Sequence, residues 1–330
     1  NPYILAQQKT FKLIKKYRQF GLNLFNLVFM QVESPLRDND FFIKKVCLSA
    51  KNKSKVIVGN INLGGTGKTP LVLWILEKLL IKGLHPGLVS RGYGSKINSY
   101  KEVTLTSNVS EVGDEPLLIK SKLNLPVFVG ADRVAVAQAL LSKYPEVNII
   151  ISDDGLQHYR LARNFEIIVK DSSRGFGNGY IFPAGPLREP ISRLNSVDAL
   201  VINGDSDYAN YYKMCYQFDL LINCKNYKKI QVNKLPYSKN IALTAIGNPD
   251  NFFKSLSDLK IKFTKKIYND HHLFTEKDFN YFDSSTNIIM TEKDAVKCKK
   301  FARDNFWYLP IKPKVDEQLF LNIIKKLGIK

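Results

Sequence analysis

A glycine-rich segment has the residue types and spacing that phosphate binding requires. It follows the apolar run Lys55–Val58 and precedes a helix expected to begin near Gly67. Glycines let backbone N–H groups converge on phosphate oxygens, and the start of a helix adds a favourable dipole. In such a P-loop cradle, Lys68 would reach the β- and γ-phosphates of a nucleotide and Thr69 would hold Mg²⁺. The predicted cradle is Asn62-Leu63-Gly64-Gly65-Thr66-Gly67-Lys68-Thr69.

The cradle departs from the strict pattern at its first position, where Asn62 stands instead of glycine. Asn tolerates the left-handed backbone conformation better than most other residues, so the loop can still form. An ordinary glycine-rich turn is the alternative interpretation.

Two adjacent carboxylates, Asp153 and Asp154, follow the apolar run Asn148–Ser152. The carboxyl end of a buried strand lies at the ligand-binding edge of a parallel sheet. Neighbouring carboxylates repel each other, and a cation is the natural compensation. This pair is therefore a candidate Mg²⁺ site, and a capping or turn pair before Gly155 is the alternative. His158 could contact nucleotide or acceptor, or be structural.

Asp114 and Glu115 stand at a predicted helix start, in Gly113-Asp114-Glu115-Pro116. Backbone N–H groups there stabilise carboxylates as anions. The functional hypothesis is a base and a metal ligand, and the structural one is helix capping. His271 and His272 follow Asp270; because adjacent side chains diverge, binding or proton transfer is favoured over a shared metal site.

Two further loops carry cations after predicted strands. Arg91 and Tyr93 put a guanidinium and a phenol on the loop Ser90–Gly94, opposite the cradle. Arg188 is presented by the proline-rich loop Phe182–Pro190, where it suits a phosphate or a developing negative charge.

The elements that must position these residues alternate along the chain. From residue 55 onward, apolar runs alternate with amphipathic segments, which predicts an α/β fold with a mostly parallel, P-loop NTPase-like sheet. The expected strands are Lys55–Val58, Pro86–Val89, Val127–Val129, Asn148–Ser152 and Phe165–Val169, with helices at Gly67–Lys82, Glu115–Lys122 and Arg133–Lys143.

A second series predicts a smaller C-terminal α/β lobe. The expected division is an N-terminal helical segment at 1–45, a P-loop kinase core at 46–200 and the lobe at 201–330. Lys213–Val232 is typical of a β-ribbon. The lobe's expected strands are Ala199–Ile202, Ile241–Leu243, Asn287–Met290 and Phe306–Leu309, with helices at Pro249–Leu259, Thr275–Phe282 and Glu317–Leu327.

The amino-acid composition of the chain indicates which classes of molecule it could bind. The 330 residues are 45% hydrophobic, enough for a sizeable core. Lys and Arg outnumber Asp and Glu by 49 to 30, and the net charge of +19 indicates nucleic acid, anionic lipid or a phosphorylated substrate as partner. The four cysteines form no C-x-x-C pair, which favours a reducing cytoplasm over a disulfide framework or zinc site.

The N-terminus has a basic-then-apolar order. Lysines and Arg18 precede the apolar stretch Phe20–Met30, which asparagines interrupt at helical intervals. This favours an amphipathic helix lying in a membrane interface, and no apolar run reaches the roughly 18 residues of a membrane span. A secretory signal, without an A-x-A-like cleavage site, and a helix packed on the protein's own core are the alternatives.

Together these motifs resemble the tetraacyldisaccharide 4′-kinase family, the lipid A 4′-kinases of Gram-negative bacteria. The resemblance covers nearly the whole chain, and Leu156 stands where many relatives would have Phe. It rests on segments 59–70, 90–94, 112–116, 153–158, 183–190, 247–249, 270–272 and 290–295.

The resemblance implies transfer of the ATP γ-phosphate to the 4′-hydroxyl of an acylated glucosamine disaccharide phosphate. It implies a peripheral enzyme on the cytoplasmic face of the bacterial inner membrane, in contact with anionic lipid. Asp114 would act as the base, with either His271 or His272. Mg²⁺ would be held by Thr69, Glu115 and one of Asp153 and Asp154, while Arg91, Tyr93 and Arg188 would meet the substrate.

The sequence argues against two other classes of P-loop protein. A GTPase should carry an N-K-x-D guanine motif, and Asn233-Lys234-Leu235-Pro236 lacks its Asp. A nucleic-acid-binding ATPase would explain the charge, but no aromatic-rich RNA-binding signature is present. No nucleic-acid partner is therefore expected.

Overall fold

The computed structural model describes residues 53–92, 99–206, 208–237 and 239–329. The predicted N-terminal helix and Tyr93 lie outside these ranges. In the described part of the chain, no helix has the length and apolar composition needed to cross a bilayer.

A nine-stranded sheet forms the centre of the molecule, in the order β15-β8-β7-β6-β1-β5-β2-β4-β3. All neighbours from β8 to β4 pair in parallel, and the two edge strands β3 and β15 are antiparallel. The predicted α/β class with a largely parallel sheet is thus confirmed. The strands are β1 (Ser54–Gly59), β2 (Pro86–Ser90), β3 (Tyr100–Glu102), β4 (Val127–Gly130), β5 (Ile149–Asp153), β6 (Phe165–Asp171), β7 (Ala199–Asn203), β8 (Tyr212–Gln217) and β15 (Lys312–Val315).

Helices cover both faces of this sheet, which explains its continuous apolar strands. Adjacent residues of a strand point to opposite faces. Val56 and Val58 of β1 therefore pack with α4, whereas Ile57 packs with α7. The helices around this sheet are α4 (Lys68–Ile81), α5 (Val109–Val112), α6 (Asp114–Lys122), α7 (Arg133–Lys143) and α10 (Glu317–Lys326).

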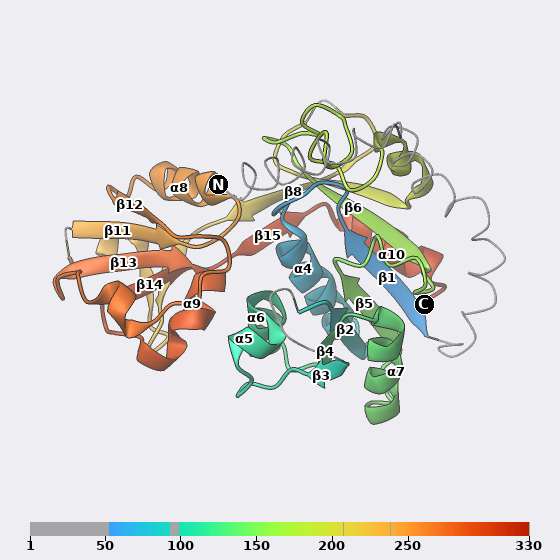
Figure 1. Ribbon diagram of the computed structural model, residues 1–330, viewed down its shortest axis with the longest axis horizontal. Coiled ribbons are helices and arrows are strands. Elements are labelled where there is room, and N and C mark those ends of the chain that lie inside the picture. Colours follow the sequence, from blue (N-terminus) through green and yellow to red (C-terminus); the bar gives the residue numbers. More distant parts are fainter. Residues whose placement is uncertain (1–52, 93–98, 207, 238, 330) are drawn as a thin grey trace, which may run out of the picture.

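A six-stranded sheet, in the order β10-β9-β14-β13-β11-β12, lies beside the first with α8 and α9 (Figure 1). Phe252 and Leu256 of α8 pack on one side of it, and Ala295 and Cys298 of α9 on the other. The elements are β9 (Leu220–Asn223), β10 (Lys229–Gln231), β11 (Lys239–Thr244), β12 (Thr264–Ile267), β13 (Thr286–Thr291), β14 (Phe306–Leu309), α8 (Pro249–Asp258) and α9 (Glu292–Cys298).

The division between the two sheets differs from the expected boundary at residue 200. The strands β7, β8 and β15 and the helix α10 all belong to the nine-stranded side, because the chain crosses to the second sheet after β8 and returns after β14. The predicted ribbon at Lys213–Val232 is therefore divided. Its first strand, β8, pairs with β7 and β15 of the nine-stranded sheet. Of the three strands in this segment, only β9 and β10 pair with each other, and they do so in antiparallel orientation.

Two segments differ from the expected helices. Thr275–Phe282 contains only the short 3-10 helix η4 (Glu276–Phe279), closed by a reciprocal capping box between Thr275 and Asp278. In contrast, α9 was not predicted. It begins directly after β13, where the Thr291 side chain accepts a hydrogen bond from the Asp294 amide, so no loop separates strand from helix.

Candidate active site

The glycine-rich loop joins β1 to α4 as predicted. Gly64 and Gly67 have φ angles of 95° and 96°, a region that side chains rarely enter. The buried Asn60 organises the loop from inside, because its Nδ2 donates to the Gly64 carbonyl and to Thr66 Oγ1, each at 3.2 Å. The loop is thus shaped by its own residues to present backbone N–H groups.

Asn62 does not adopt the left-handed conformation considered for it. It forms an antiparallel β-bridge with Leu187, and its Nδ2 donates to the Gly175 carbonyl at 2.8 Å. An asparagine side chain here ties the loop to its surroundings, a contact that glycine could not make.

The proline-rich loop lies against the cradle. The Leu63 amide donates to the Pro186 carbonyl at 2.8 Å, and the Arg188 amide donates to the Ile61 carbonyl at 2.6 Å. These backbone contacts bring the Arg188 side chain to the cradle.

Asp154 joins the two cations of this region. Lys68 Nζ lies 3.3 Å from its Oδ1, and Arg188 Nη1 donates to the same oxygen at 2.9 Å. Burial acts to raise the pKa of Asp154, but the charges of Lys68 and Arg188 hold that pKa below its usual range. The two cations predicted to bind phosphate are thereby held at one carboxylate beside the glycine-rich loop.

Asp153, unlike Asp154, is not paired with a cation among the described residues. It is fully buried, and neither carboxylate oxygen has a hydrogen-bond partner among the described residues. Burial, followed by the negative charge of Glu115, raises its pKa to about 7. An unpartnered carboxylate under the influence of a second one is the kind of site that a divalent cation would satisfy.

The predicted metal ligands do not form a closed cluster. No group of three or more His, Cys, Asp or Glu in the described part of the chain is arranged to hold a metal ion. Glu115 instead pairs with Lys293, whose Nζ lies 3.0 Å from its Oε1. Of the predicted ligands, Asp153 is the one for which the described residues show buried oxygens without a hydrogen-bond partner, and the charge of Glu115 acts on its pKa.

Asp114 stands at the first turn of α6 and is only 3% exposed. Three cationic or proton-bearing groups of the second sheet surround it: His271 Nδ1 at 3.1 Å from Oδ2, Lys293 Nζ at 3.6 Å from Oδ1, and Lys297 Nζ at 3.6 Å from Oδ2. Burial alone would raise the pKa of Asp114, but the His271 contact and the two lysines hold the pKa well below its usual range. The surroundings of Asp114 therefore favour its ionised form.

The two adjacent histidines diverge. His271 has a φ of 60°, and its amide donates to the Ala245 carbonyl at 3.0 Å, which turns its ring towards Asp114. His272 instead stacks on Tyr268, with ring centroids 4.8 Å apart, and its Nε2 lies 3.4 Å from Asp278 Oδ1. The structure thus brings His271, and not His272, to the predicted base.

The remaining predicted residues lie nearer the rim. His158 Nε2 is 3.7 Å from Oδ1 of Asp132, the N-cap of α7, and burial followed by the charge of Arg133 lowers its pKa. No contact of His158 with the cradle is found in the described residues. Arg91 is exposed directly after β2.

Sequence reasoning missed several members of the site. Gln157 donates through Nε2 to the Asn60 carbonyl at 3.0 Å and to Glu189 Oε1 at 2.7 Å. It therefore connects the start of the glycine-rich loop to the proline-rich loop. Arg133 is buried, which lowers its pKa to about 10, and the negative charges of Asp153 and Asp154 partly offset this lowering. Gln157 and Lys293 lie within motifs already singled out, but no local signal marked Arg133 or Lys297.

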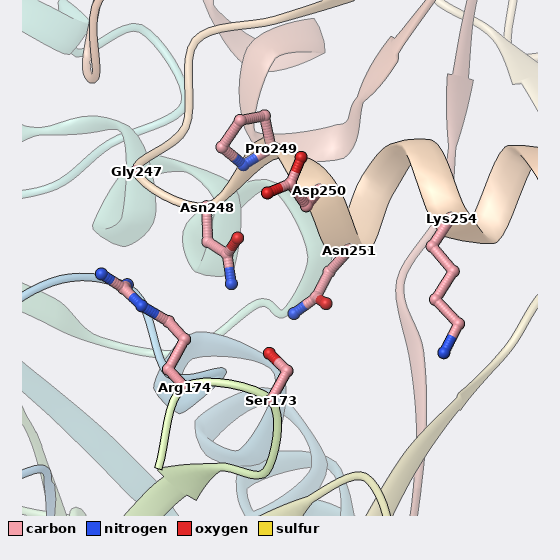
Figure 2. A pocket seen from close by; sticks show the side chains of 8 residues that line it. All are labelled: Ser173, Arg174, Gly247, Asn248, Pro249, Asp250, Asn251 and Lys254. Carbon is pink, nitrogen blue, oxygen red and sulfur yellow. The ribbon is translucent and has the colours of Figure 1, made fainter. Parts of the chain in front are cut away.

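A cavity of about 580 Å³ lies beside the cradle, between the turn after β6 and the start of α8. Figure 2 shows Ser173, Asn248 and Asn251 turned towards the same space, with the Arg174 guanidinium directed to one side of it. Arg174 links the cavity to the cradle, because its Nη1 lies 2.8 Å from where a Cβ on Gly64 would be. Asn251 Nδ2 also donates to Asp171 Oδ2 at 3.0 Å and so connects the two sheets. The lining residues are Ser173, Arg174, Gly247, Asn248, Pro249, Asp250, Asn251 and Lys254.

Comparison with known proteins agrees with this geometry. The family model described as LpxK, tetraacyldisaccharide-1-P 4′-kinase, matches residues 26–328. The tetraacyldisaccharide 4′-kinase of Methylobacillus flagellatus is 47% identical over 82% of this chain and 81% of its own length. That of Francisella tularensis subsp. novicida is 41% identical over 88% and 93%, respectively. A solved structure described as an "apo" form of LpxK from Aquifex aeolicus in complex with ATP has 26% identity and a TM-score of 0.69, covering 90% of this chain and 99% of that one.

Proposed function

Because this chain belongs to the family of tetraacyldisaccharide-1-P 4′-kinases, we propose that Asp114 and His271 activate the acceptor while Lys68 and Arg188 hold the nucleotide phosphates. The chain is an ATP-dependent kinase that transfers the γ-phosphate of ATP to the 4′-hydroxyl of a tetraacyldisaccharide 1-phosphate, a step of lipid A biosynthesis.

The contact between Asp114 and His271 carries this assignment. It joins an anion of the nine-stranded side to a histidine of the six-stranded side. Glu115, the neighbour of Asp114, and Lys68 of the cradle both influence the pKa of Asp153. Asp153 is therefore near both the neighbour of the proposed base and the lysine of the cradle, which supports a shared site for acceptor and nucleotide.

In the transfer step, the 4′-oxygen bonds to the γ-phosphorus as the bond from phosphorus to the ADP oxygen breaks. The hydroxyl proton passes to the Asp114–His271 pair. A carboxylate held so strongly as an anion is a weak base, but phosphoryl transfer through a loose transition state needs mainly positioning and charge stabilisation. Lys68 and Arg188 would stabilise charge on the transferring group once the phosphates replace Asp154 as their partner.

Asp153, Glu115 and Thr69 would hold Mg²⁺, which when bound supplies neutralisation of charge on the phosphates. The support is the pair of unpartnered, buried Asp153 oxygens. If Asp153→Asn retained full activity at low Mg²⁺, Asp153 could not be a ligand.

The cavity beside the cradle would take the nucleoside end of ATP. Its position next to Gly64 and the convergence of Ser173, Asn248 and Asn251 support this (Figure 2). Asn248→Leu should raise KM for ATP several-fold with kcat retained. An unchanged KM would exclude this location.

The lipid substrate and the net charge of +19 support attachment to anionic lipid on the cytoplasmic face of the inner membrane. Residues 1–45 would form the interfacial segment. The nine-stranded sheet would form a kinase core and the six-stranded sheet a smaller lobe, with Arg91 and Tyr93 meeting the phosphorylated headgroup.

The decisive experiment measures ATP turnover with tetraacyldisaccharide 1-phosphate in mixed micelles, and separately with DNA and with RNA. Stimulation by the lipid alone is expected. Stimulation by nucleic acid and none by the lipid would contradict the kinase assignment.

A further inference from the structure

Lys297 and Asp294 form a buried ion pair that the proposed chemistry does not use. Lys297 Nζ lies 2.8 Å from Asp294 Oδ1, and the two side chains are only 2% and 0% exposed. Burying two charges has a large desolvation cost, and such a pair often adds little net stability. The pair therefore calls for a role other than stabilising α9.

The second oxygen of Asp294 fixes the end of β11 to the start of α9. Asp294 Oδ2 accepts hydrogen bonds from Thr244 Oγ1 at 2.8 Å, from the Ala245 amide at 3.1 Å and from Thr291 Oγ1 at 2.7 Å. These three partners of Oδ2 lie in the interior, where hydrogen bonds are strong and geometrically restrictive.

Ala245 connects this network to the active site. Its amide donates to Asp294, and its carbonyl accepts the hydrogen bond from the His271 amide at 3.0 Å. The same short segment after β11 thus holds both Asp294 and the backbone of the histidine that contacts Asp114.

Lys297 contacts Asp114 as well as Asp294. Its Nζ lies 3.6 Å from Asp114 Oδ2, the oxygen that His271 Nδ1 also approaches, and 5.4 Å from the centre of the Phe274 ring. Contacts therefore run from Asp114 through His271, Ala245, Asp294 and Lys297 back to Asp114. Fixing one member of such a ring restricts the others.

We propose that Lys297 is a positioning residue, which docks α9 against the start of α6 so that His271 and Asp114 meet in the geometry that transfer requires. At 2% exposure its side chain cannot reach a substrate, so it acts through Asp114. This inference rests on the proposed roles of Asp114 and His271.

Lys293, one turn earlier on α9, provides a contrast. Its side chain is 16% exposed and reaches Asp114 Oδ1 at 3.6 Å and Glu115 Oε1 at 3.0 Å. It has no contact with Asp294 among those found in the described residues. Lys293 thus belongs to the rim of the site, whereas Lys297 links Asp114 to Asp294, which is bonded to the end of β11.

The first test compares Lys297→Met with Lys300→Met, an exposed lysine that follows α9. Methionine keeps the length of the stem and removes the charge. We expect Lys297→Met to lower kcat by roughly 10- to 100-fold, the range typical when an outer partner of a site is lost. KM for ATP should stay within about twofold, since the cradle is untouched. Lys300→Met should match the wild type. An unchanged kcat in folded Lys297→Met would overturn the proposal.

Lys297→Met leaves Asp294 Oδ1 unpaired and could prevent folding. If Lys297→Met does not fold, the double variant Asp294→Asn/Lys297→Met is tested in its place, because it removes both charges of the buried pair. Circular dichroism and the melting temperature identify which variant is folded, and the same loss of kcat is expected in that variant.

A double-mutant cycle with Asp114→Asn separates positioning from a general structural effect. If Lys297 acts through Asp114, adding the Lys297 substitution to Asp114→Asn should change kcat by less than about threefold. If the two losses of kcat multiply in the combined variant, Lys297 acts independently of Asp114 and the inference is overturned. Retained activity in Asp114→Asn alone would instead refute the proposed base, so the two failures are distinguishable.

Discussion

The Nδ1 atom of His271 lies 3.1 Å from Oδ2 of Asp114, although 157 positions separate the two residues in the chain. The contact joins the first turn of α6 to the loop between β12 and η4, and so spans the two sheets. Two lysines of α9 approach the same carboxylate. The site is therefore complete only when both sheets are packed together.

Asp114→Asn tests the base directly, because it keeps the shape of the side chain and removes its charge. We expect kcat to fall by roughly 10²–10⁴, the contribution of a positioned general base, with little change in ATP affinity. A residue that merely capped α6 would cost about 1 kcal/mol of stability and keep activity. Glu111→Gln, on the neighbouring α5, is the matched control. Intact kcat with a lower melting temperature would reduce Asp114 to a structural cap.

The adjacent histidines offer a matched pair of substitutions. Asparagine tolerates the φ of 60° at His271, so His271→Asn should fold and lose at least about tenfold in kcat. His272→Asn removes a ring stacked on Tyr268 and should cost about 0.5–1.5 kcal/mol of stability with kcat retained. Steady-state kinetics and thermal melts on both variants check this. The reverse pattern would assign the partner of Asp114 to His272.

Lys68→Met should lower turnover by roughly 10²–10³, the loss typical when one group that stabilises transition-state charge is removed. The fold should survive, because Lys68 lies on the loop edge and Asp154 retains Arg188 as a partner. Lys78→Met, on the same helix, is the control. Near-normal turnover of Lys68→Met at saturating ATP would argue against the cradle assignment.

Asp153 predicts a pH dependence of stability. Its pKa of about 7 in the folded state exceeds the value of about 4 expected in the unfolded chain. The folded state therefore binds more protons between about pH 4 and pH 7, and its stability should fall as pH rises through that window. The melting temperature of Asp153→Asn relative to the wild type should thus be higher at pH 8 than at pH 5.

The same melting temperatures can be measured with and without Mg²⁺. At pH 8, Mg²⁺ should raise the melting temperature of the wild type and not that of Asp153→Asn, since a bound cation compensates the ionised carboxylate. Equal shifts in both proteins would remove Asp153 from the proposed ligands. Asp154→Asn is a useful companion, because Asp154 is already paired with Lys68 and Arg188.

Deleting residues 1–30 should weaken binding to vesicles that contain anionic lipid. The loss should be greatest at low ionic strength, where the charges of the N-terminal lysines are least screened. Flotation of the full chain and of the deletion variant at two salt concentrations measures it. Flotation that does not change on deletion would rule out this segment as the membrane anchor.

Sequence alone predicted the parts of this protein that depend on neighbouring residues. The cradle at 62–69, the acid pair after β5 and the parallel sheet all follow from local spacing, because a strand, a glycine-rich turn and a helix start are specified within a few residues. The boundary near residue 200 was not predictable in this way. β15 is a short strand that contains Pro313, and it joins β8 only because the chain returns to the first sheet after β14.

The choice between His271 and His272 was decided by tertiary structure. The two are chemically identical and adjacent, so composition and spacing could not separate them. The φ of 60° at His271 and its bond to the Ala245 carbonyl turn one ring towards Asp114, while Tyr268 and Asp278 hold the other away. Lys297 likewise had no local signal, because its role depends on Asp294 being fixed to β11 at Thr244, 50 positions earlier in the chain. Contacts between distant segments form only when the two sheets pack, and they set the geometry of this site.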